Sequence, residues 1–236
     1  MMRNEKTIVI GGSSGIGKAV ATLASKKEAE VTVTGLTESK LDMLKSDLPN
    51  VKITSLDVND EEAVNAFING FDTIDHLYIA AGSTKLGSIL DGTVEEQMAP
   101  IDLRLKGSVY VIRAAAKKMN TGGSITFTGG LSTDRPVSGA WVSGIGTAVA
   151  EQLARVMALE LAPIRFNAVS PGWTDTPMWD TILGEGKQEV FEQVAEKQPV
   201  KRLATPNEVA QAVLFFMENK SVTGEIIHVD GGARLV

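Results

Sequence analysis

The 236-residue chain contains no cysteine, and this absence excludes disulfide bonds, thiolate metal sites and cysteine nucleophiles. It also lacks any apolar run near the ~20 residues that cross a bilayer. The apolar stretch before Gly11 is too short to be the core of a signal peptide. We therefore expect a cytoplasmic protein that does not interact with membranes and whose fold starts at the N-terminus.

An excess of positive charge is also missing. The chain has 23 Lys and Arg against 29 Asp and Glu, a net charge of −6, which lacks the basic footprint of a nucleic-acid-binding protein. Histidine is rare, and we interpret both His76 and His228 as structural. No cluster has the spacing of a metal site, so we predict neither a nucleic-acid partner nor a metal.

Short β-branched runs alternate with longer helical stretches. Several runs are apolar at nearly every position, as in strands buried on both faces. This order predicts right-handed βαβ units and a mostly parallel sheet. We expect strands over Thr7–Ile10, Val31–Thr34, Lys52–Leu56, Leu77–Ala80, Ser124–Thr128, Arg165–Val169 and Glu225–Val229.

The helices can be placed from their apolar spacing and end signals. We expect them over Gly15–Lys27, Asp60–Ile68, Val94–Met119, Gly146–Leu161 and Pro206–Met217. Pro100 should bend or divide the third of these. No linker or repeat interrupts the pattern, so residues 1–236 are predicted to form one domain.

The segment from Ile8 to Lys18 reads IVIGGSSGIGK, which is a strand, a glycine-rich turn and a helix start. Glycine permits positive φ and a close approach of the backbone to a ligand. The helix N-terminus then offers free N–H groups and a positive dipole end to a pyrophosphate. This pattern predicts dinucleotide binding, with a merely tight turn as the alternative. The candidate residues are Gly11, Ser13, Ser14, Gly15, Ile16 and Gly17.

The spacing G-x-x-x-G-x-G resembles that of the short-chain dehydrogenase/reductase family. The resemblance continues over essentially the whole chain, in LELAPIRFNAVSPG at 159–172 and VDGG at 229–232. It implies a Rossmann-type α/β fold, a doubly wound sheet of about seven parallel strands with helices on both faces. It further implies cofactor contacts from Asp57 and Val58, from Ala80, Ala81 and Gly82, and from Pro171, Gly172, Thr174 and Thr176.

The cofactor preference depends on the end of the second strand. An acid there would bind the ribose hydroxyls of NAD, but this chain has Gly35, so nothing repels a 2′-phosphate. Leu36 stands where NADP-using relatives often have arginine, while Thr37, Ser39 and Lys40 offer polar or positive groups and Glu38 opposes them. We favour NADP(H) over NAD(H), with Leu36 and Thr37 near the phosphate.

The family's catalytic Asn, Ser, Tyr and Lys are all replaced. Aligned on the resemblance, Ser143 takes the tyrosine place, Thr147 the lysine place, Gly130 the serine place and Arg104 the asparagine place. An alcohol such as Ser143 is too weak an acid near pH 7 unless strongly activated. Arg104 could stabilise an oxyanion, fill the space of the lost lysine with positive charge, or form a structural salt bridge. Our catalytic candidates are Ser143, Thr147, Arg104 and Ser132.

Residues 173–203 are expected to form a substrate lid, since Met178, Trp179, Ile182 and Leu183 make it apolar and two glycines allow it to move. Three hypotheses stay open. The first is an NADP(H)-dependent oxidoreductase that acts on a small carbonyl or alcohol with non-standard catalytic residues. The second is a catalytically silent NADP(H)-binding sensor or partner subunit, and the third a non-redox lyase or isomerase. The resemblance also implies a homodimer or homotetramer.

Overall fold

A seven-stranded, fully parallel sheet forms the centre of the computed structural model, which describes residues 2–236. Its order is β3-β2-β1-β4-β5-β6-β7. The strands are β1 (Lys6–Ile10), β2 (Glu30–Gly35), β3 (Lys52–Ser55), β4 (Ile74–Ile79), β5 (Met119–Thr128), β6 (Arg165–Pro171) and β7 (Ile226–Val229). The prediction of seven parallel strands in a Rossmann-type α/β fold is confirmed.

Eight α-helices connect or follow the strands among the described residues. They are α1 (Gly15–Lys26), α2 (Glu38–Asp47), α3 (Glu61–Asn69), α4 (Val94–Ala115), α5 (Trp141–Glu160), α6 (Met178–Leu183), α7 (Lys187–Lys197) and α8 (Pro206–Glu218). Four short 3-10 turns complete the structure: η1 (Ala116–Lys118), η2 (Leu131–Thr133), η3 (Gly184–Gly186) and η4 (Ala233–Leu235).

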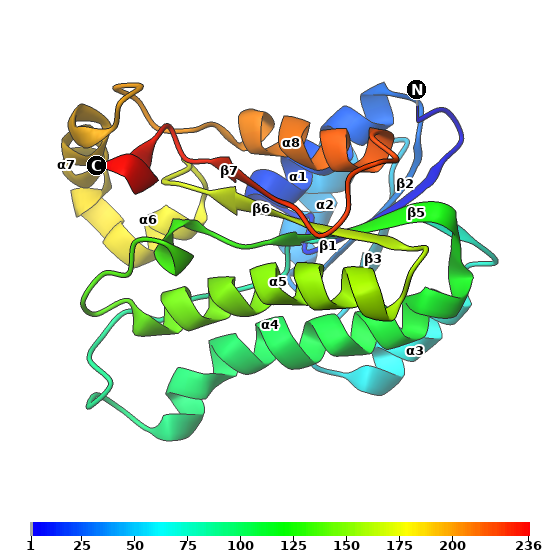
Figure 1. The fold of residues 1–236 in the computed structure, drawn as a ribbon, viewed down its shortest axis with the longest axis horizontal. Helices are drawn as coiled ribbons and strands as arrows, with labels where there is room; N and C mark the ends of the chain where they lie inside the picture. The colour runs from blue at the N-terminus through cyan, green and yellow to red at the C-terminus, as the bar shows by residue number, and fades with distance from the viewer. Residues whose placement is uncertain (1) are drawn as a thin grey trace.

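The helices form two layers, one on each face of the sheet (Figure 1). Helices α3, α4 and α5 cover one face, where Val64, Val111 and Leu153 pack on strand residues such as Ile8. Helices α1, α2 and α8 cover the other, where Val20 and Val213 belong to the second buried cluster. Side chains alternate between these faces along each strand, which is why the strands are apolar at nearly every position.

The strand order reverses beside β1, which pairs with β2 on one side and β4 on the other. At such a switch point the loops after the two strands diverge, and they leave a crevice at the carboxyl edge of the sheet. The segments after β1, β2, β4, β5 and β6 all leave from this edge, because the strands are parallel. The predicted cofactor and catalytic segments are therefore on the same side of the molecule.

Helix starts follow the capping residues. Asp60 accepts a bond from the amide of Ala63 at 2.9 Å and begins α3, as its acidic first turn predicted. Thr93 and Glu96 form a capping box on α4, and Thr205 and Glu208 form one on α8. Helix α1 differs, since its N-cap Ser14 makes no side-chain cap bond.

Several predicted boundaries were wrong. Helix α5 begins at Trp141 rather than near Gly146, because Gly144 and Gly146 have low intrinsic helix propensity but lie inside a packed helix. Helix α4 ends at Ala115, since Met119 already pairs with Ile74 in the sheet. Pro100 does not divide α4. A proline removes one backbone bond, and the surrounding packing supports the helix across it.

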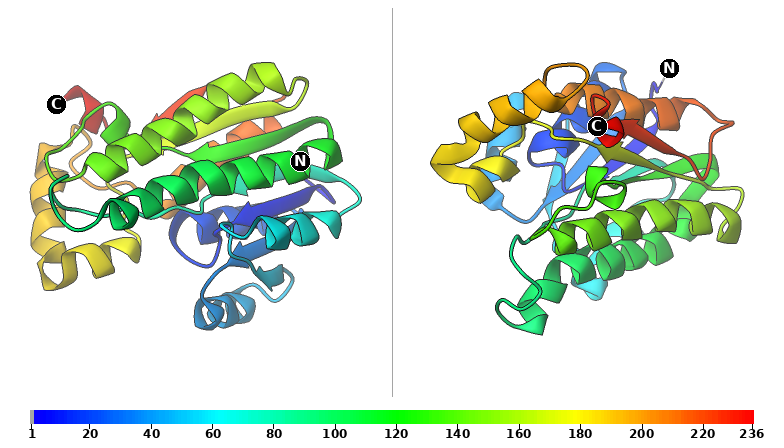
Figure 2. Two further views of the ribbon diagram at one scale, coloured as in Figure 1. Left: turned by 90° about the horizontal axis from the view of Figure 1, so that it is seen from below. Right: turned by 60° about the vertical axis from the view of Figure 1, so that its left-hand side comes forward.

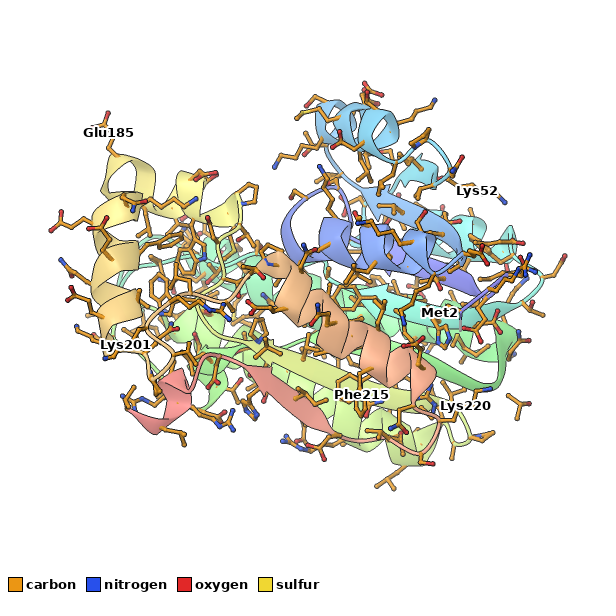
Figure 3. All side chains as sticks on the ribbon, turned by 90° about the horizontal axis from the view of Figure 1, so that it is seen from above. Met2, Lys52, Glu185, Lys201, Phe215 and Lys220 are labelled. Carbon is orange, nitrogen blue, oxygen red and sulfur yellow. The ribbon has the colours of Figure 1, made fainter. Side chains whose placement is uncertain are left out.

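Three helices were not predicted as such: α2, α6 and α7. Helices α6 and α7 project beyond the end of the sheet, beside the C-terminal η4 (Figure 2). With side chains drawn, Glu185 and Lys201 lie on this projection, far from Lys52 at the β3 edge (Figure 3). Within residues 2–236, no helix combines the length and apolar character needed to cross a membrane.

Candidate functional site: a crevice at the carboxyl edge of the sheet

The glycine-rich turn after β1 lies directly against the segment after β4. Gly11 has a φ of +81°, and a Cβ there would lie 2.6 Å from the backbone nitrogen of Ala81. The amides of Ala80 and Ala81 both donate to the carbonyl of Ile10, at 2.8 and 3.0 Å. A side chain at position 11 would thus push apart two segments that were predicted to contact the same cofactor.

The N-terminus of α1 is available to an anion. Ser14 has an extended backbone, its side chain caps no amide, and the first turn carries no acidic residue. The first N–H groups of a helix have no partner inside the helix, and the dipole end there is positive. The local chemistry fits a pyrophosphate, with Ser13, Gly15, Ile16 and Gly17 around the turn.

The loop after β6 reaches the same turn. A Cβ at Gly15 would lie 3.3 Å from Cγ2 of Thr176, although the two residues are 161 positions apart. The Thr174 hydroxyl donates to the carbonyl of Gly172 at 3.0 Å, and both threonines are buried. Gly172 in turn packs against Asp230, whose Cα would be 2.7 Å from a Cβ at position 172. The structure therefore brings the predicted 171–176 loop to the glycine-rich turn.

The other end of the crevice contains the residues predicted to select the cofactor. Ser13 Oγ lies 3.1 Å from where Gly35 would carry a Cβ, so a larger residue at 35 would crowd the turn. Leu36 is exposed and Thr37 caps α2 without a side-chain bond. Asp57 is exposed and accepts from the Asn59 amide at 2.9 Å.

Val58 is placed differently from its predicted partner Asp57. Its side chain is buried in the core and meets α4, where Cγ2 would be 2.9 Å from a Cβ at Gly107. Only the backbone of Val58 is thus free to contribute to the crevice. Sequence resemblance alone does not separate these two roles.

Ser143 and Thr147, predicted to stand at the tyrosine and lysine places, belong to a set of hydrogen-bonded hydroxyls. Ser143 Oγ donates to Ser132 Oγ at 3.3 Å, which joins two of the predicted catalytic residues. Thr147 accepts a bond from Thr133 at 3.0 Å and donates to the carbonyl of Ser143 at 2.9 Å. The Thr147 hydroxyl thus links η2 to α5 by hydrogen bonds. Ser132 only accepts in its bond with Ser143, so its own hydroxyl proton remains available to a further acceptor.

Gly130, predicted to stand at the family's serine place, lies against Thr147. A Cβ at position 130 would lie 2.8 Å from Thr147 Cγ2. Restoring a serine there would therefore require Thr147 to move. The backbone N–H of Gly130 donates to the buried carboxylate of Glu151 at 3.2 Å. The replacements at 130 and 147 are consequently packed as a pair rather than leaving a gap.

Arg104 extends from α4 toward the end of β5, where Nη1 donates to the carbonyl of Thr128 at 2.9 Å. Burial lowers the pKa of this guanidinium. A salt bridge was one interpretation of Arg104 from the sequence. No Asp or Glu within residues 2–236 pairs with it, so this interpretation is wrong.

Neither tyrosine lies at one of the predicted catalytic positions. The Tyr78 hydroxyl is buried in β4, 2.7 Å from Thr128 Oγ1. Burial raises the pKa of Tyr78, despite the opposing effects of the Thr128 bond and Arg104. A raised pKa makes the phenol a poorer acid near neutrality. Tyr110 lies in the second half of α4, five residues before the helix ends at Ala115.

Sequence reasoning missed one pair near this edge. His228 Nε2 lies 2.8 Å from Asp134 Oδ2, so β7 is fastened to the segment after η2 although the two residues are 94 positions apart. No local pattern indicated this pair. Among the described residues, no group of three or more His, Asp or Glu side chains could hold a metal ion.

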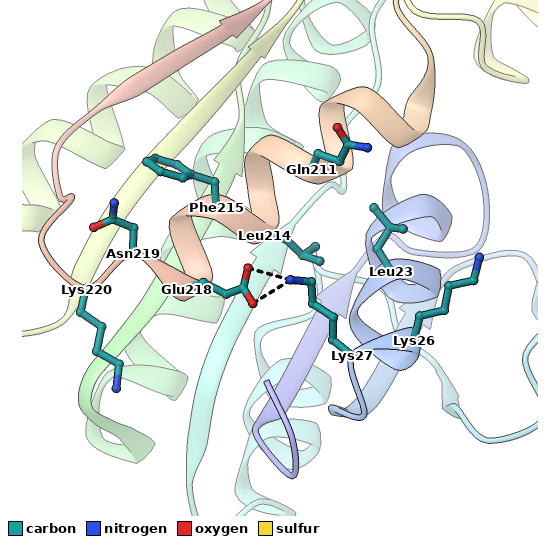
Figure 4. Close-up of a pocket in the computed structure, with 9 residues that line it drawn as sticks. All are labelled: Leu23, Lys26, Lys27, Gln211, Leu214, Phe215, Glu218, Asn219 and Lys220. Carbon is teal, nitrogen blue, oxygen red and sulfur yellow. Dashed lines mark hydrogen bonds and ion pairs between the residues drawn. The ribbon is translucent and has the colours of Figure 1, made fainter. Parts of the chain in front are cut away.

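A separate groove lies between α1 and α8. Leu23 and Lys27 of the α1 end, together with Leu214, Phe215 and Glu218 of α8, line a space of about 800 Å³ (Figure 4). Lys27 Nζ bonds Glu218 across it at 2.7 Å, while Lys26 and Lys220 point away from each other. None of the predicted site residues lines this groove, so it carries none of the chemistry above.

Comparisons with known proteins agree with the geometry. A family model described as enoyl-(acyl carrier protein) reductase matches residues 11–234. Short-chain dehydrogenase/reductase ATR9 of Stachybotrys chlorohalonatus is 30% identical, over 99% of this chain and 98% of its own. Carbonyl reductase family member 4 of Xenopus laevis is 29% identical, over 96% and 97%.

Two solved structures extend the likeness. A small-chain dehydrogenase in complex with NADPH has a TM-score of 0.86 at 29% identity, covering 99% of this chain and 100% of that one. The MalC reductase/Diels-Alderase of Malbranchea aurantiaca has a TM-score of 0.93 at 27% identity, covering 100% and 98%. The similarity to both is global, as it spans the crevice and the projecting helices alike.

Proposed function

Because the chain belongs to the short-chain dehydrogenase/reductase family, whose members use nicotinamide cofactors, we propose that it is an NADP(H)-dependent oxidoreductase of a small carbonyl or alcohol. The observation that carries this proposal is the meeting of the glycine-rich turn with the 171–176 loop, where a Cβ at Gly15 would lie 3.3 Å from Thr176 Cγ2. A turn that served only the fold would not need a bare helix N-terminus and a second loop beside it.

The chain's residues hold the cofactor at both ends of the crevice. Gly11 and Gly17 let the backbone approach the pyrophosphate, and the N-terminus of α1 neutralises part of its charge. Asp57 and the backbone of Val58 border the adenosine side, and Pro171, Gly172, Thr174 and Thr176 border the nicotinamide side. Ala80 and Ala81 lie between them against the glycine-rich turn, with Gly82 beside Arg104. When bound, the cofactor supplies or accepts a hydride.

NADP(H) is favoured over NAD(H) because position 35 offers no carboxylate. An acid there would repel a 2′-phosphate, and any Cβ at Gly35 would lie 3.1 Å from Ser13 Oγ. Thr37 makes no cap bond, so its hydroxyl and the first amides of α2 are free to meet a phosphate. One structural relative is a complex with NADPH, in agreement with this preference.

The substrate oxygen is polarised by the serine hydroxyls. Since Ser143 donates to Ser132, the proton of Ser132 is free to point at a carbonyl, and the proton consumed comes from solvent. Thr147 positions this pair through the Ser143 carbonyl, and Arg104 supplies positive charge. Residues 173–203 act as the lid, in which Trp179 Nε1 bonds the Thr174 carbonyl at 3.0 Å.

A titration of tryptophan fluorescence with NADPH and with NADH tests the proposal, because Trp173 and Trp179 lie beside the proposed nicotinamide loop. We expect saturable energy transfer to NADPH at lower concentration than to NADH. NADPH oxidation with a panel of carbonyls should follow, and S132A and S143A should each lower kcat. Failure of folded protein to bind either cofactor contradicts the proposal.

A second candidate is a catalytically silent NADP(H)-binding subunit. The observation in its favour is that the crevice contains alcohols where a phenol and an ammonium would be needed, and that Tyr78 is buried. It predicts tight NADPH binding with no turnover of any carbonyl or alcohol. The two candidates therefore share the titration and differ in the oxidation assay.

A further inference from the structure

Arg104 occupies a space that two glycines leave for it. A Cβ at Gly82 would lie 2.8 Å from Cζ of Arg104, and a Cβ at Gly146 would lie 2.9 Å from its Cδ. The side chain therefore crosses from α4 to α5 and ends beside the segment that follows β4. Even an alanine at either glycine would collide with it.

The guanidinium is only partly satisfied. A guanidinium has five N–H donors. In the described chain Arg104 makes one hydrogen bond, from Nη1 to the carbonyl of Thr128 at 2.9 Å. Neither Nε nor Nη2 is among the fully buried polar atoms without partners, so solvent reaches both. The Nε and Nη2 donors thus have no hydrogen-bond partner in the described chain, and both atoms keep some contact with solvent.

The acidic side chains of this edge have other partners. Glu151 accepts from the Gly130 amide at 3.2 Å, and Asp134 pairs with His228 at 2.8 Å. A partly buried cation without a counter-charge is costly, and an incoming anion would offset that cost. The same loss of hydration on burial lowers the pKa of Arg104.

Arg104 also lies against the helix face that carries the hydrogen-bonded hydroxyls. Gly146 is three residues after Ser143 and next to Thr147, so these positions share one side of α5. Ser143 in turn bonds Ser132 at 3.3 Å. Ser132 and Arg104 therefore both lie against this side of α5.

We propose that the substrate is an oxo acid, or the corresponding hydroxy acid, whose carboxylate is bound by the Nε and Nη2 donors of the Arg104 guanidinium. This inference rests on the proposed function. Guanidinium and carboxylate match as planar bidentate partners, which a neutral ester cannot reproduce. In the reduction, the cofactor's hydride forms a C–H bond as the carbonyl π bond breaks, a solvent proton joins the oxygen, and NADPH becomes NADP⁺.

The test compares acids with their neutral esters at saturating NADPH: pyruvate with methyl pyruvate, acetoacetate with methyl acetoacetate, and levulinate with methyl levulinate. We expect at least one acid to exceed its ester about tenfold or more in kcat/KM. R104M should abolish that preference mainly by raising KM, and R104K should keep part of it. R113Q removes an exposed arginine from the same helix and should behave like the wild type.

Binding of oxalate to the NADPH-loaded protein, followed by calorimetry, gives a readout without turnover. Binding to the wild type and R113Q but not to R104M supports the inference, even if no carbonyl is reduced and the oxidoreductase proposal fails. Equal rates with acids and esters, or an acid preference unchanged in R104M, overturn it while leaving the proposed function in place. If R104M does not fold, the wild-type comparisons of acid with ester and of oxalate binding decide.

Discussion

The indole rings of Trp173 and Trp179 stack with their centroids 4.3 Å apart and their planes 15° from parallel. Phe191 of α7 meets both rings edge-on, at 6.5 and 6.3 Å. Lys187 Nζ, which bonds Asp175 and Asp180 at 2.8 Å each, lies 5.1 Å from the Phe191 ring centroid. The proposed lid is thereby joined to the proposed nicotinamide loop through aromatic contacts.

Replacing Trp179 with alanine should loosen both segments. The stack and the bond from Nε1 to the Thr174 carbonyl are lost together, at a cost of about 1–2 kcal/mol in unfolding free energy. We also expect weaker NADPH binding, because Thr174 loses its support. W179F keeps a ring without the N–H and should fall between W179A and the wild type. NADPH affinity equal to that of the wild type in W179A would show that lid and loop are independent.

Gly17→Ala should weaken cofactor binding. A Cβ there would collide with the Gly11 carbonyl oxygen and lie 2.8 Å from Gly12 Cα, so α1 must move away from the turn. We expect NADPH affinity to fall about tenfold or more, since the displaced amides no longer converge on the pyrophosphate. The control is G70A at the end of α3, outside the crevice, where the one atom near a Cβ is the Phe67 carbonyl oxygen at 3.2 Å. Titration and thermal unfolding of both variants separate a binding defect from a folding defect.

His76 should make the stability of the protein depend on pH. It is buried, with Nδ1 2.8 Å from Ser124 Oγ and Nε2 3.2 Å from Glu5. Burial lowers the pKa of His76 below its usual 6.5, and Arg165 acts in the same direction, although Glu5 and Asp75 oppose them. The folded state therefore takes up this proton less readily than the unfolded state. The contribution is present above about pH 6.5 and is lost as the pH falls below it.

Denaturant unfolding of the wild type and H76Q at pH 7.5 and 5.5 measures this effect. The wild type should lose more stability between the two pH values than H76Q, because glutamine does not titrate. Other acidic groups affect both proteins alike, so the comparison isolates the imidazole. Parallel losses in the two proteins would rule out His76 as the cause.

Glu208 should stabilise the start of α8 at neutral pH. It completes the capping box with Thr205 and receives two bonds from Arg202, of 2.9 and 2.6 Å. The bond from Arg202, and then that from the Thr205 amide, hold the pKa of Glu208 at about 2. Because the folded pKa is depressed, this stability is present above the usual pKa near 4.3 and lost as the pH falls toward 2.

E208A should lower the unfolding free energy by about 1 kcal/mol at pH 7, the usual cost of a lost cap. The ion pair itself adds little, since a third of the Glu208 side chain is exposed and water screens it. The difference between E208Q and the wild type should shrink between pH 5 and pH 3. A difference that grew on acidification would contradict this assignment.

Much of the fold was predictable because its signals are local. The apolar runs at 7–10 and 165–169 were long enough to mark buried strands, and Asp60 marked the start of α3 as its cap. Helix α5 was placed too late because glycines at 144 and 146 lower helix propensity, whereas packing against β6 decides the outcome. Helix α2 has only Leu41 and Leu44 buried, which is too weak a pattern to identify from the sequence.

The sequence by itself determined the family and the position of the glycine-rich turn, and it predicted the loss of the usual tyrosine and lysine, because each is a property of residues close together in the chain. Only the tertiary structure decided what stands in their place. Arg104 fits between Gly82 and Gly146, and Ser132 meets Ser143, because helix packing sets those distances. A side chain's partners across the crevice depend on how the two helix layers pack on the sheet, and no local sequence pattern encodes that packing.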